Sequence, residues 1–488
     1  MGISSALNNA ASGLAASARL ADTISNNVAN AMTEGFARRS IEVTSLSLGG
    51  LGTGVRTGAA TRAENAYLTA ERRSLDASLG AAAARSGAYD RLLTALGEPG
   101  DAGALSTLAT ALETTLMAAT ASPQATTKLS DAVTAAGDVA TALNRIAAET
   151  QALRTDADSE IAAQVDTVNA ALRGIDALNR RIASLAPQGV DVTALADERS
   201  RLVDTISPII PVKVAKRENG AIAVYSAGGG VLLDGRVYEL GFTKAANAVT
   251  ADQSVGAGLS GLSQDRGAQT GPDAVAVGTG RGIFDGGSLS ALFEVRDTLA
   301  PEVGRELDAY ANDLIERFRD LMPAAALDGS GRGLFVEGGP GGTTGLASRI
   351  AINAAVDPGA GGAVWRLRDG LSAAAPGSEG NGSVLQAWSD AMSALRAPAG
   401  FVSQSASNGA ATIASEITSF FAGRAARSDE DRAFLTARQT TLSEEEMHAT
   451  GVDSDSELQS MMLVEQAYAA NARVLSVIDD LMKLLLEV

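Results

Sequence analysis

Both ends of the chain carry a seven-residue apolar repeat. Apolar or small residues recur at alternating steps of three and four along residues 3–28 and again along residues 461–485. This spacing keeps one face of an α-helix turned toward a partner helix, as in a coiled coil. The first stripe comprises Ile3, Leu7, Ala10, Leu14, Ser17, Ala21, Ile24 and Val28, and the second comprises Met461, Val464, Tyr468, Asn471, Leu475, Ile478, Met482 and Leu485. A chain whose first and last helices both need partners is predicted to assemble through them.

The stripes have a second interpretation, in which both helices belong to the core of one folded domain. Burying each large apolar side chain of the last stripe gains about 2 kcal/mol. Ordering the backbone of that helix costs about 1–2 kcal/mol per residue, which one buried face does not offset. We therefore expect burial on several sides, as a tubular assembly provides. Asn471 fits a polar position that sets the register of a coiled coil, or alternatively a contact with a neighbouring loop.

Composition narrows the possible functions. The chain has 488 residues, enough for more than one domain, and a formal net charge of -18. This charge argues against binding to nucleic acid or to anionic membrane surfaces, which reward clustered Lys and Arg. The chain has no cysteine, which excludes disulfides, thiolate metal sites and cysteine nucleophiles. No apolar run reaches the ~20 residues that cross a bilayer, and the N-terminus lacks the pattern of a cleavable signal peptide.

The apolar periodicity predicts a mainly α fold with a β-rich insert. A short extended segment over 36–47 and a glycine-rich loop at 49–54 are expected before the first helix of the body. Asn219-Gly220 between alternating apolar runs predicts a hairpin. The predicted domains are a terminal coiled-coil domain (1–35 and 452–488), a discontinuous helical-bundle domain (36–207, 286–324 and 384–451), an outer β-rich insert (208–285), and glycine-rich loops with short strands (325–383). Since the insert enters and leaves between helices, we expect the helical body to fold without it.

No residue pattern in the sequence specifies catalysis. The single histidine, His448, follows three glutamates and is a conceivable zinc ligand, but a solvated helix end is the simpler interpretation. The acidic run 429–431 is likewise expected to be a solvated helix start. Two Gly-Arg loops, at 278–282 and 329–333, lack the Gly-Lys-Ser/Thr ending of a phosphate-binding loop. Paired carboxylates of a glycosidase stay open, because their separation is not visible in a sequence. We predict no catalytic residue, no cofactor and no metal.

Two motifs, one at each end, resemble the signatures of a known superfamily. The N-terminal motif comprises Ser25, Asn26, Asn27, Ala29, Asn30, Thr33, Gly35 and Phe36, and the C-terminal motif includes Gln466 and Ala467. They are similar to the terminal signatures of flagellar rod, hook and hook-associated proteins. Glu34 stands where that pattern often has Pro, and of the Ser-Arg-Gln that often follows the aromatic residue only Arg38 is retained.

Three internal segments narrow the resemblance to the hook-associated protein 1 family. The helical block at 62–206 is unlike the β-rich middle of hook and distal-rod proteins. The segment 197–204 resembles a family helix that leads into a β domain, and 286–308 resembles a second family segment. Other axial proteins, namely hook, distal rod or flagellin-like proteins, are the nearest alternative. A secreted cell-wall hydrolase on an axial scaffold is an alternative from another class.

The resemblance implies a structural, non-enzymatic component of the bacterial flagellum at the junction between hook and filament. It implies export by the flagellar type III system to the cell exterior and a ring of copies flanked by hook protein and a second junction protein. An export chaperone is expected to hold the C-terminal segment, and no nucleic acid or membrane partner is expected. The expected assembly interface comprises Ile3, Leu7, Leu14, Ile24, Val28, Met461, Val464, Tyr468, Asn471, Leu475, Ile478, Met482 and Leu485.

Overall fold

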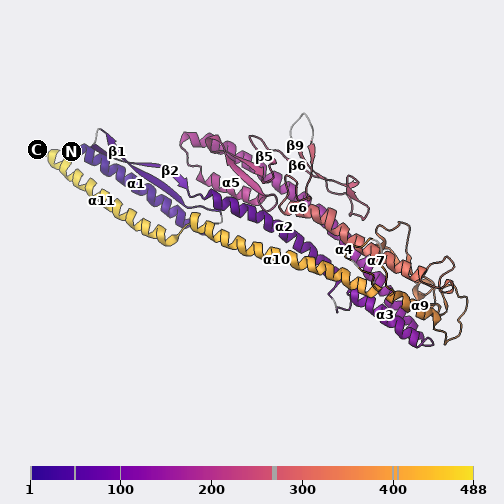
Figure 1. The fold of residues 1–488 in the computed structure, drawn as a ribbon. Coiled ribbons are helices and arrows are strands. Elements are labelled where there is room, and N and C mark those ends of the chain that lie inside the picture. The colour runs from indigo at the N-terminus through magenta and orange to yellow at the C-terminus, as the bar shows by residue number, and fades with distance from the viewer. Residues whose placement is uncertain are drawn as a thin grey trace.

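The computed structural model describes residues 3–33, 35–48, 51–98, 100–265, 272–397, 400–403 and 406–486. These residues form an elongated molecule of long helices with a small β region on one side (Figure 1). The main helices are α1 (Ile3–Ala29), α2 (Ala66–Leu96), α3 (Leu105–Ala121), α4 (Thr126–Leu185), α5 (Thr193–Ile206), α6 (Ser288–Glu294), α7 (Ala300–Asp320), α8 (Arg366–Asp369), α9 (Ser383–Ser393), α10 (Ala410–Thr450) and α11 (Ser454–Leu486). The predicted mainly α fold with a β-rich middle is confirmed.

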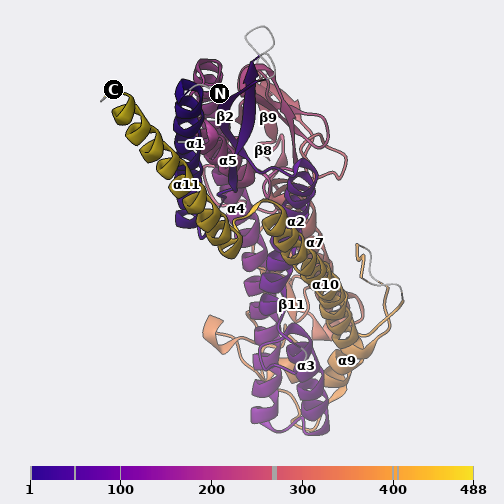
Figure 2. The same ribbon diagram turned by 90° about the vertical axis from the view of Figure 1, so that its left-hand side faces the viewer.

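The terminal helices pair with each other at one end of the molecule. Helix α1 lies beside α11, and both chain ends lie at the same tip (Figure 1). Asn27 contacts Glu457, while Gly13 lies against Asn471, so the two helices run antiparallel. Figure 2 shows α11 crossing α1 at an angle. The first and last helices of the chain thus pack on each other within one molecule.

A long hairpin lies along α1. Strands β1 (Arg39–Leu48) and β2 (Leu51–Arg62) pair antiparallel, with Thr44 opposite Arg56. Ser12 of α1 accepts a hydrogen bond from the backbone N–H of Val55 at 3.1 Å, which ties β2 to the helix. The glycine-rich loop predicted at 49–54 is wrong for residues 51–54, which belong to β2, while residues 49–50 lie outside the described residues. Glycine has a low strand propensity, but here the close approach to α1 requires residues without bulky side chains: a Cβ on Gly54 would lie 2.3 Å from Ser12 Oγ.

The helical body has a core at the end of the molecule far from the terminal pair. It is formed by α2, α3, the first half of α4, α7, α9 and the first half of α10 (Figure 1). Large side chains such as Leu143, Tyr310 and Trp388 are completely buried. The rings of Phe318 and Trp388 lie 5.6 Å apart. The predicted glycine-rich segment contributes the short antiparallel pair β11 (Phe335–Glu337) and β12 (Ile350–Ile352) to this region.

A second core joins the β region to helices. The strands are β3 (Val212–Lys216), β4 (Ile222–Ser226), β5 (Val231–Leu233), β6 (Leu240–Gly241), β7 (Ser254–Val255), β8 (Gly258–Leu259), β9 (Leu262–Asp265) and β10 (Pro272–Val275). They form sheets of order β3-β4-β5 and β10-β9-β6 and a small β7-β8 pair. The predicted Asn-Gly hairpin connects β3 and β4, with Asn219 at a φ of 53°.

The β strands share this second core with α4, α5 and α6. Leu172 of α4, Val224 of β4 and Phe284 belong to one buried cluster. A buried ion pair between Arg296 and Asp158, 2.6 Å apart, lies at the same boundary. This packing argues against the expectation that the helical body folds without residues 208–285, because removal would uncover one side of α4.

Candidate functional site at the joint of the terminal helices

The chain bends sharply between α10 and α11, and the N-terminal signature lies at this bend. The backbone N–H of Arg38 donates to the carbonyl of Thr450 at 2.8 Å, which fixes the end of α10 to the segment after α1. Asp453 accepts from the backbone N–H groups of Asp455 at 3.0 Å and Ser456 at 3.3 Å. Asp453 therefore caps the N-terminus of α11. We call the region around this bend the joint.

Asn27 of the signature is the buried centre of the joint. Its Nδ2 donates to the carbonyl of Arg39 at 2.8 Å and to Glu457 Oε2 at 3.2 Å, and its Oδ1 accepts from the Arg39 N–H at 3.0 Å. Glu457 is 1% exposed, and its other oxygen accepts from Arg38 Nε at 2.6 Å. Only an amide side chain supplies both the acceptor and the donors that this position uses. The Asn27–Glu457–Arg38 cluster, which includes the retained Arg38, holds α1, β1 and α11 together.

The other signature residues shape the turn that follows α1. Asn26 accepts from the Arg39 guanidinium at 3.2 Å, and Asn30 Nδ2 donates to the Asn26 carbonyl at 2.9 Å. Thr33 Oγ1 donates to Asn30 at 3.3 Å. Gly35 has a φ of 74°, where a side chain would be strained.

The two ends of the signature motif make different contacts. A Cβ on Gly35 would lie 2.8 Å from Arg201 of α5. The Arg39 guanidinium lies over the Phe36 ring, with its Cζ 4.8 Å from the ring centroid. Ser25 and Ala29 are exposed on α1. Glu34 lies outside the described residues. Most of the described motif residues therefore make contacts that hold the joint or the turn after α1.

Helix α5 connects the joint to the body through two carboxylates, Asp197 and Asp204, which lie about two turns apart. Asp197 is buried and accepts from Arg39 at 3.2 Å and from Arg62 at 2.5 Å. Asp204 accepts from both Arg72 and Arg73 of α2, each at 2.8 Å. The segment 197–204 that the sequence analysis singled out is thus the link between the hairpin, α2 and the joint.

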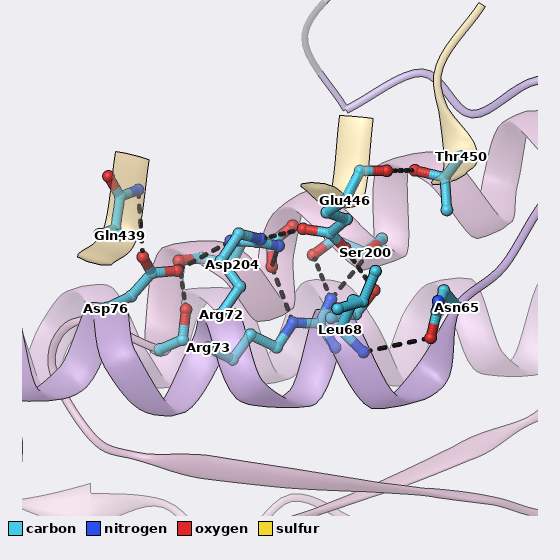
Figure 3. A network of polar contacts seen from close by, with 12 residues as sticks. Asn65, Leu68, Arg72, Arg73, Asp76, Ser200, Asp204, Gln439, Glu446 and Thr450 are labelled. Atoms are coloured by element: carbon cyan, nitrogen blue, oxygen red, sulfur yellow. Dashed lines mark hydrogen bonds and ion pairs between the residues drawn. The ribbon is translucent and has the colours of Figure 1, made fainter. Parts of the chain in front are cut away.

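Figure 3 shows how α10 joins this network. Arg72 binds three carboxylates, Asp76 at 2.8 Å, Asp204 at 2.8 Å and Glu446 of α10. Burial opposes the charge of Arg72, but Asp204 and Glu446 outweigh it and raise the pKa of the guanidinium. Burial raises the pKa of Asp76 against the opposing effect of Arg72. Arg72 therefore stays charged and fastens the end of α10 to α2 and α5.

The two predicted stripes form the seam between α1 and α11. On α1, Ala10, Ser17 and Ile24 are buried, Leu14 and Ala21 are half-buried, and Ile3, Leu7 and Val28 lie at the exposed edge. On α11, Ile478 is buried, Met461, Val464, Asn471 and Leu475 are half-buried, and Tyr468 and Met482 lie at the exposed edge. The side chain of Leu485 lies outside the described residues. Asn471 faces Gly13 on this seam, and a Cβ on Gly13 would lie 2.8 Å from the side-chain amide of Asn471.

A second heptad stripe on α11 was missed by the sequence analysis. It comprises Leu463, Ala467, Ala470, Val474, Val477, Leu481 and Leu484, at alternating steps of four and three, and all seven are exposed. Gln466 and Ala467 of the C-terminal motif lie on or beside it and contact solvent. The spacing of this second stripe is visible in the sequence, but the heptad pattern of α11 was assigned to the first stripe alone. Helix α11 therefore carries two apolar stripes, of which only one is covered by the described residues of this chain.

The acidic and histidine clusters that suggested other chemistry make ordinary surface and ion-pair contacts. His448 is exposed in the last turn of α10, while Glu446 nearby turns toward Arg72. Asp429 accepts from Ser86 Oγ at 2.6 Å. Over the described ranges, no three acidic, histidine or cysteine side chains gather as metal ligands would. Nor is any helix in that part of the chain long and apolar enough to cross a membrane.

Comparison with known proteins agrees with this architecture. A family model described as flagellar hook-associated protein FlgK helical domain matches residues 90–335. A model of the flagellar basal body rod FlgEFG protein C-terminal matches residues 447–488, which contain α11. A model of the flagella basal body rod protein matches residues 7–36, which contain most of α1 and the turn after it.

Individual relatives match about half of the chain. It is 25% identical over 260 residues to flagellar hook-associated protein 1 of Bacillus subtilis (strain 168), covering 48% of this chain and 51% of the relative. The protein of the same name from Escherichia coli (strain K12) is 25% identical over 244 residues, covering 48% and 44%.

Among solved structures, the flagellar hook junction protein FlgK from Burkholderia pseudomallei aligns with a TM-score of 0.45 and 22% identity. That alignment covers 56% of this chain and 47% of the solved one. The chain thus spans about half the length of the relatives it matches. Because the helical-domain model alone matches half of the residues, the chain belongs to the family of flagellar hook-associated proteins that FlgK defines.

Proposed function

We propose that this chain is a structural subunit of the junction between the flagellar hook and filament, and that it assembles through α1 and α11. The observation that carries the proposal is the free second stripe of α11. Unpartnered apolar faces of this kind mark interaction sites, and each large side chain that leaves water contributes about 2 kcal/mol. A helix with two heptad seams fits between neighbours on two sides, as in a bundle or tube of helices.

The partners follow from this role. Copies of the chain assemble as a ring, with hook protein on one side and a second junction protein on the other. The residues at the edge of the first stripe, among them Leu7, Val28, Tyr468 and Met482, complete the contact surface beside the second stripe. The chain is exported by the flagellar type III system to the cell exterior, and an export chaperone covers the C-terminal segment until then. The role is mechanical and requires no catalytic group, nucleic acid or membrane.

Val477→Asp tests the second stripe. Val477 is 58% exposed, so the change leaves the isolated chain folded, but it places a carboxylate on the proposed contact face, where an unpaired charge is costly. We expect an unchanged far-UV circular dichroism spectrum, normal secretion, loss of filaments and loss of swimming in a complemented strain. Flagellin shed into the medium is expected alongside hooks without filaments.

Ser476→Asp is the matched control. Ser476 is exposed beside Val477 and outside both stripes, so this variant adds the same charge and should swim normally. Leu475→Asp, on the stripe that faces α1, should block assembly by separating the two helices while the body stays folded. Wild-type filament number with Val477→Asp would refute the assembly face.

A further inference from the structure

A cavity of about 410 Å³ lies on the body beside the joint. Its walls come from the start of α2, from α5, from the β3–β4 hairpin and from the last turn of α10. Most of the wall is aliphatic and small, with Ala66 and Ala70 of α2, Ala196 and Val203 of α5, and Val212 of β3. We call it the joint cavity. Charged side chains also line it, and cavities of this size that combine apolar walls with placed polar groups are typical of ligand sites.

One arginine in the joint cavity, Arg199, has no carboxylate partner among the residues that the structure describes. Arg199 Nη1 donates to Asn179 Oδ1 at 2.9 Å and to the Gly220 carbonyl at 2.7 Å, which are both neutral acceptors. Burial lowers the pKa of this guanidinium, and the more distant Glu64 only partly opposes that effect. Arg199 is part of the segment 197–204, but it takes no part in the carboxylate links that α5 makes to the hairpin and α2.

The other cations of the cavity are already neutralised. Arg62 binds Asp197 at 2.5 Å, Arg73 binds Asp204 at 2.8 Å, and Arg217 binds Asp234 at 2.9 Å. Glu64, whose charge acts on Arg199, is bound by Lys216 at 2.7 Å. Within the residues that the structure describes, Arg199 is thus the one lining cation without a carboxylate in ion-pair contact.

This combination defines the chemistry of an occupant. A guanidinium forms its strongest hydrogen bonds with a carboxylate, often through two parallel N–H···O contacts. The alanine and valine walls favour an apolar group attached to that carboxylate, because water leaves both surfaces. An acidic residue next to an aliphatic or aromatic residue meets both requirements.

We propose that the joint cavity receives an acidic segment of a second copy of this chain, with a carboxylate on Arg199 and an apolar side chain against the alanine wall. The inference rests on the proposed assembly through α11. Thr450, the last residue of α10, lines the cavity, and α11 begins at Ser454, so a neighbour that packs on the first turns of α11 comes close to the cavity. The net charge of -18 gives every copy an excess of acidic residues for this contact.

Photocrosslinking in assembled flagella tests the occupant. Val214 lines the cavity and is 38% exposed, so Val214→p-benzoylphenylalanine places a reactive group at its opening. Val255, 53% exposed on β7 and outside the cavity, is the matched control position. We expect irradiated flagella of the Val214 variant to yield a crosslinked dimer of this chain, with the crosslink mapped by mass spectrometry to an acidic segment. The Val255 variant and the secreted monomer should yield none.

Two variants separate the charge from the apolar wall. In the crosslinking background, Arg199→Gln keeps a hydrogen-bond donor but removes the charge, and we expect the dimer yield to fall about tenfold, the usual worth of a charge-assisted contact. Arg199→Lys should retain most of it. Ala196→Leu fills the cavity from α5 with Arg199 in place and should also abolish the crosslink. Melting temperatures of the monomers identify any variant that fails to fold.

The failure of this inference is distinguishable from failure of the assembly proposal. Flagella that form normally while Val214 crosslinks to a different protein, or to nothing, would refute the second copy as occupant and leave assembly through α11 intact. An unchanged yield with Arg199→Gln would refute the carboxylate contact. Filaments that persist with Val477→Asp would instead remove the premise on which the inference rests.

Discussion

At the scale of single residues, the joint depends on an asparagine that bonds in two directions. The Asn27 amide pairs with both backbone groups of Arg39 and also reaches Glu457. The signature residues around Asn27 therefore fix the turn after α1 and the contact of α1 with α11. Breaking one member of a buried polar cluster costs more than the average hydrogen bond, because the remaining groups stay buried without partners.

Asn27→Asp should loosen the joint. The new carboxylate faces the buried carboxylate of Glu457 and lacks the Nδ2 donor, so we expect a loss of about 2–4 kcal/mol in the interaction of α11 with α1. Hydrogen exchange should accelerate in the first turns of α11 while the body core keeps its protection. Asn26→Asp is the control, since Asn26 is exposed and already accepts from Arg39. Equal protection of α11 in both variants would contradict this role of Asn27.

At the scale of elements, α4 is one helix that serves two cores. Leu143 in its first half belongs to the core of the helical body, and Leu172 in its second half belongs to the core shared with the β strands. Fully buried residues of the β region, such as Leu232 and Phe284, complete that second core. The β region therefore supports the helix on which it lies rather than standing as a removable unit.

Leu232→Ala should destabilise the helices as well as the strands. Truncation of a fully buried leucine costs about 2–5 kcal/mol, and the shared core should carry this loss into the second half of α4 and into α5. Calorimetry and site-resolved hydrogen exchange measure both effects. Val255→Ala, at an exposed position on β7, should stay within about 0.5 kcal/mol of wild type. A separate melting transition for the strands, with α4 unaffected, would restore the independent insert.

At the scale of the whole molecule, packing thins out from the body toward the terminal pair. In the described part of α11 only Glu457 and Ile478 are buried, whereas α4 buries residues along most of its length. The far half of α10 is fastened to α2 chiefly by polar contacts, among them Arg438–Glu71 at 2.8 Å. Beyond Ala425, its only buried residue in the described range is Leu442. Stability should therefore fall along the long axis (Figure 1).

Amide exchange in the dilute chain should follow this gradient. We expect fast exchange over most of α1 and over α11 beyond the first turns that the Asn27–Glu457 contact holds. Exchange should be intermediate over residues 430–450 and slow over residues 129–182 of α4. Raising the salt concentration to about 1 M screens exposed charges to within ~3 Å, so exchange should accelerate at 430–450 more than at 410–425. Uniform protection along the molecule, in a sample shown to be monomeric, would contradict the gradient.

Local patterns in the sequence determined a large part of this architecture. The heptad stripes, the Asn-Gly turn between β3 and β4, and the Asp453 cap of α11 each depend on residues a few positions apart, where periodicity and turn chemistry act. The order of helices around a β-rich middle and the position of the terminal signatures were predictable for the same reason. The long strand β2 was not predictable from local pattern, because glycine has a low strand propensity. Its glycines are held in a strand by pairing with β1.

Only the tertiary structure decided which of these surfaces meet. It turned the predicted stripe of α11 toward α1, which leaves the second stripe of that helix free. It brought Asn27 to Glu457 across 430 positions of the chain, and within the described ranges it left Arg199 paired with neutral acceptors and no carboxylate. Periodicity states that a helix has an apolar face but not which partner covers it, since that choice depends on the summed packing of distant segments. Contacts between segments that are distant in the sequence form both the joint and the cavity beside it.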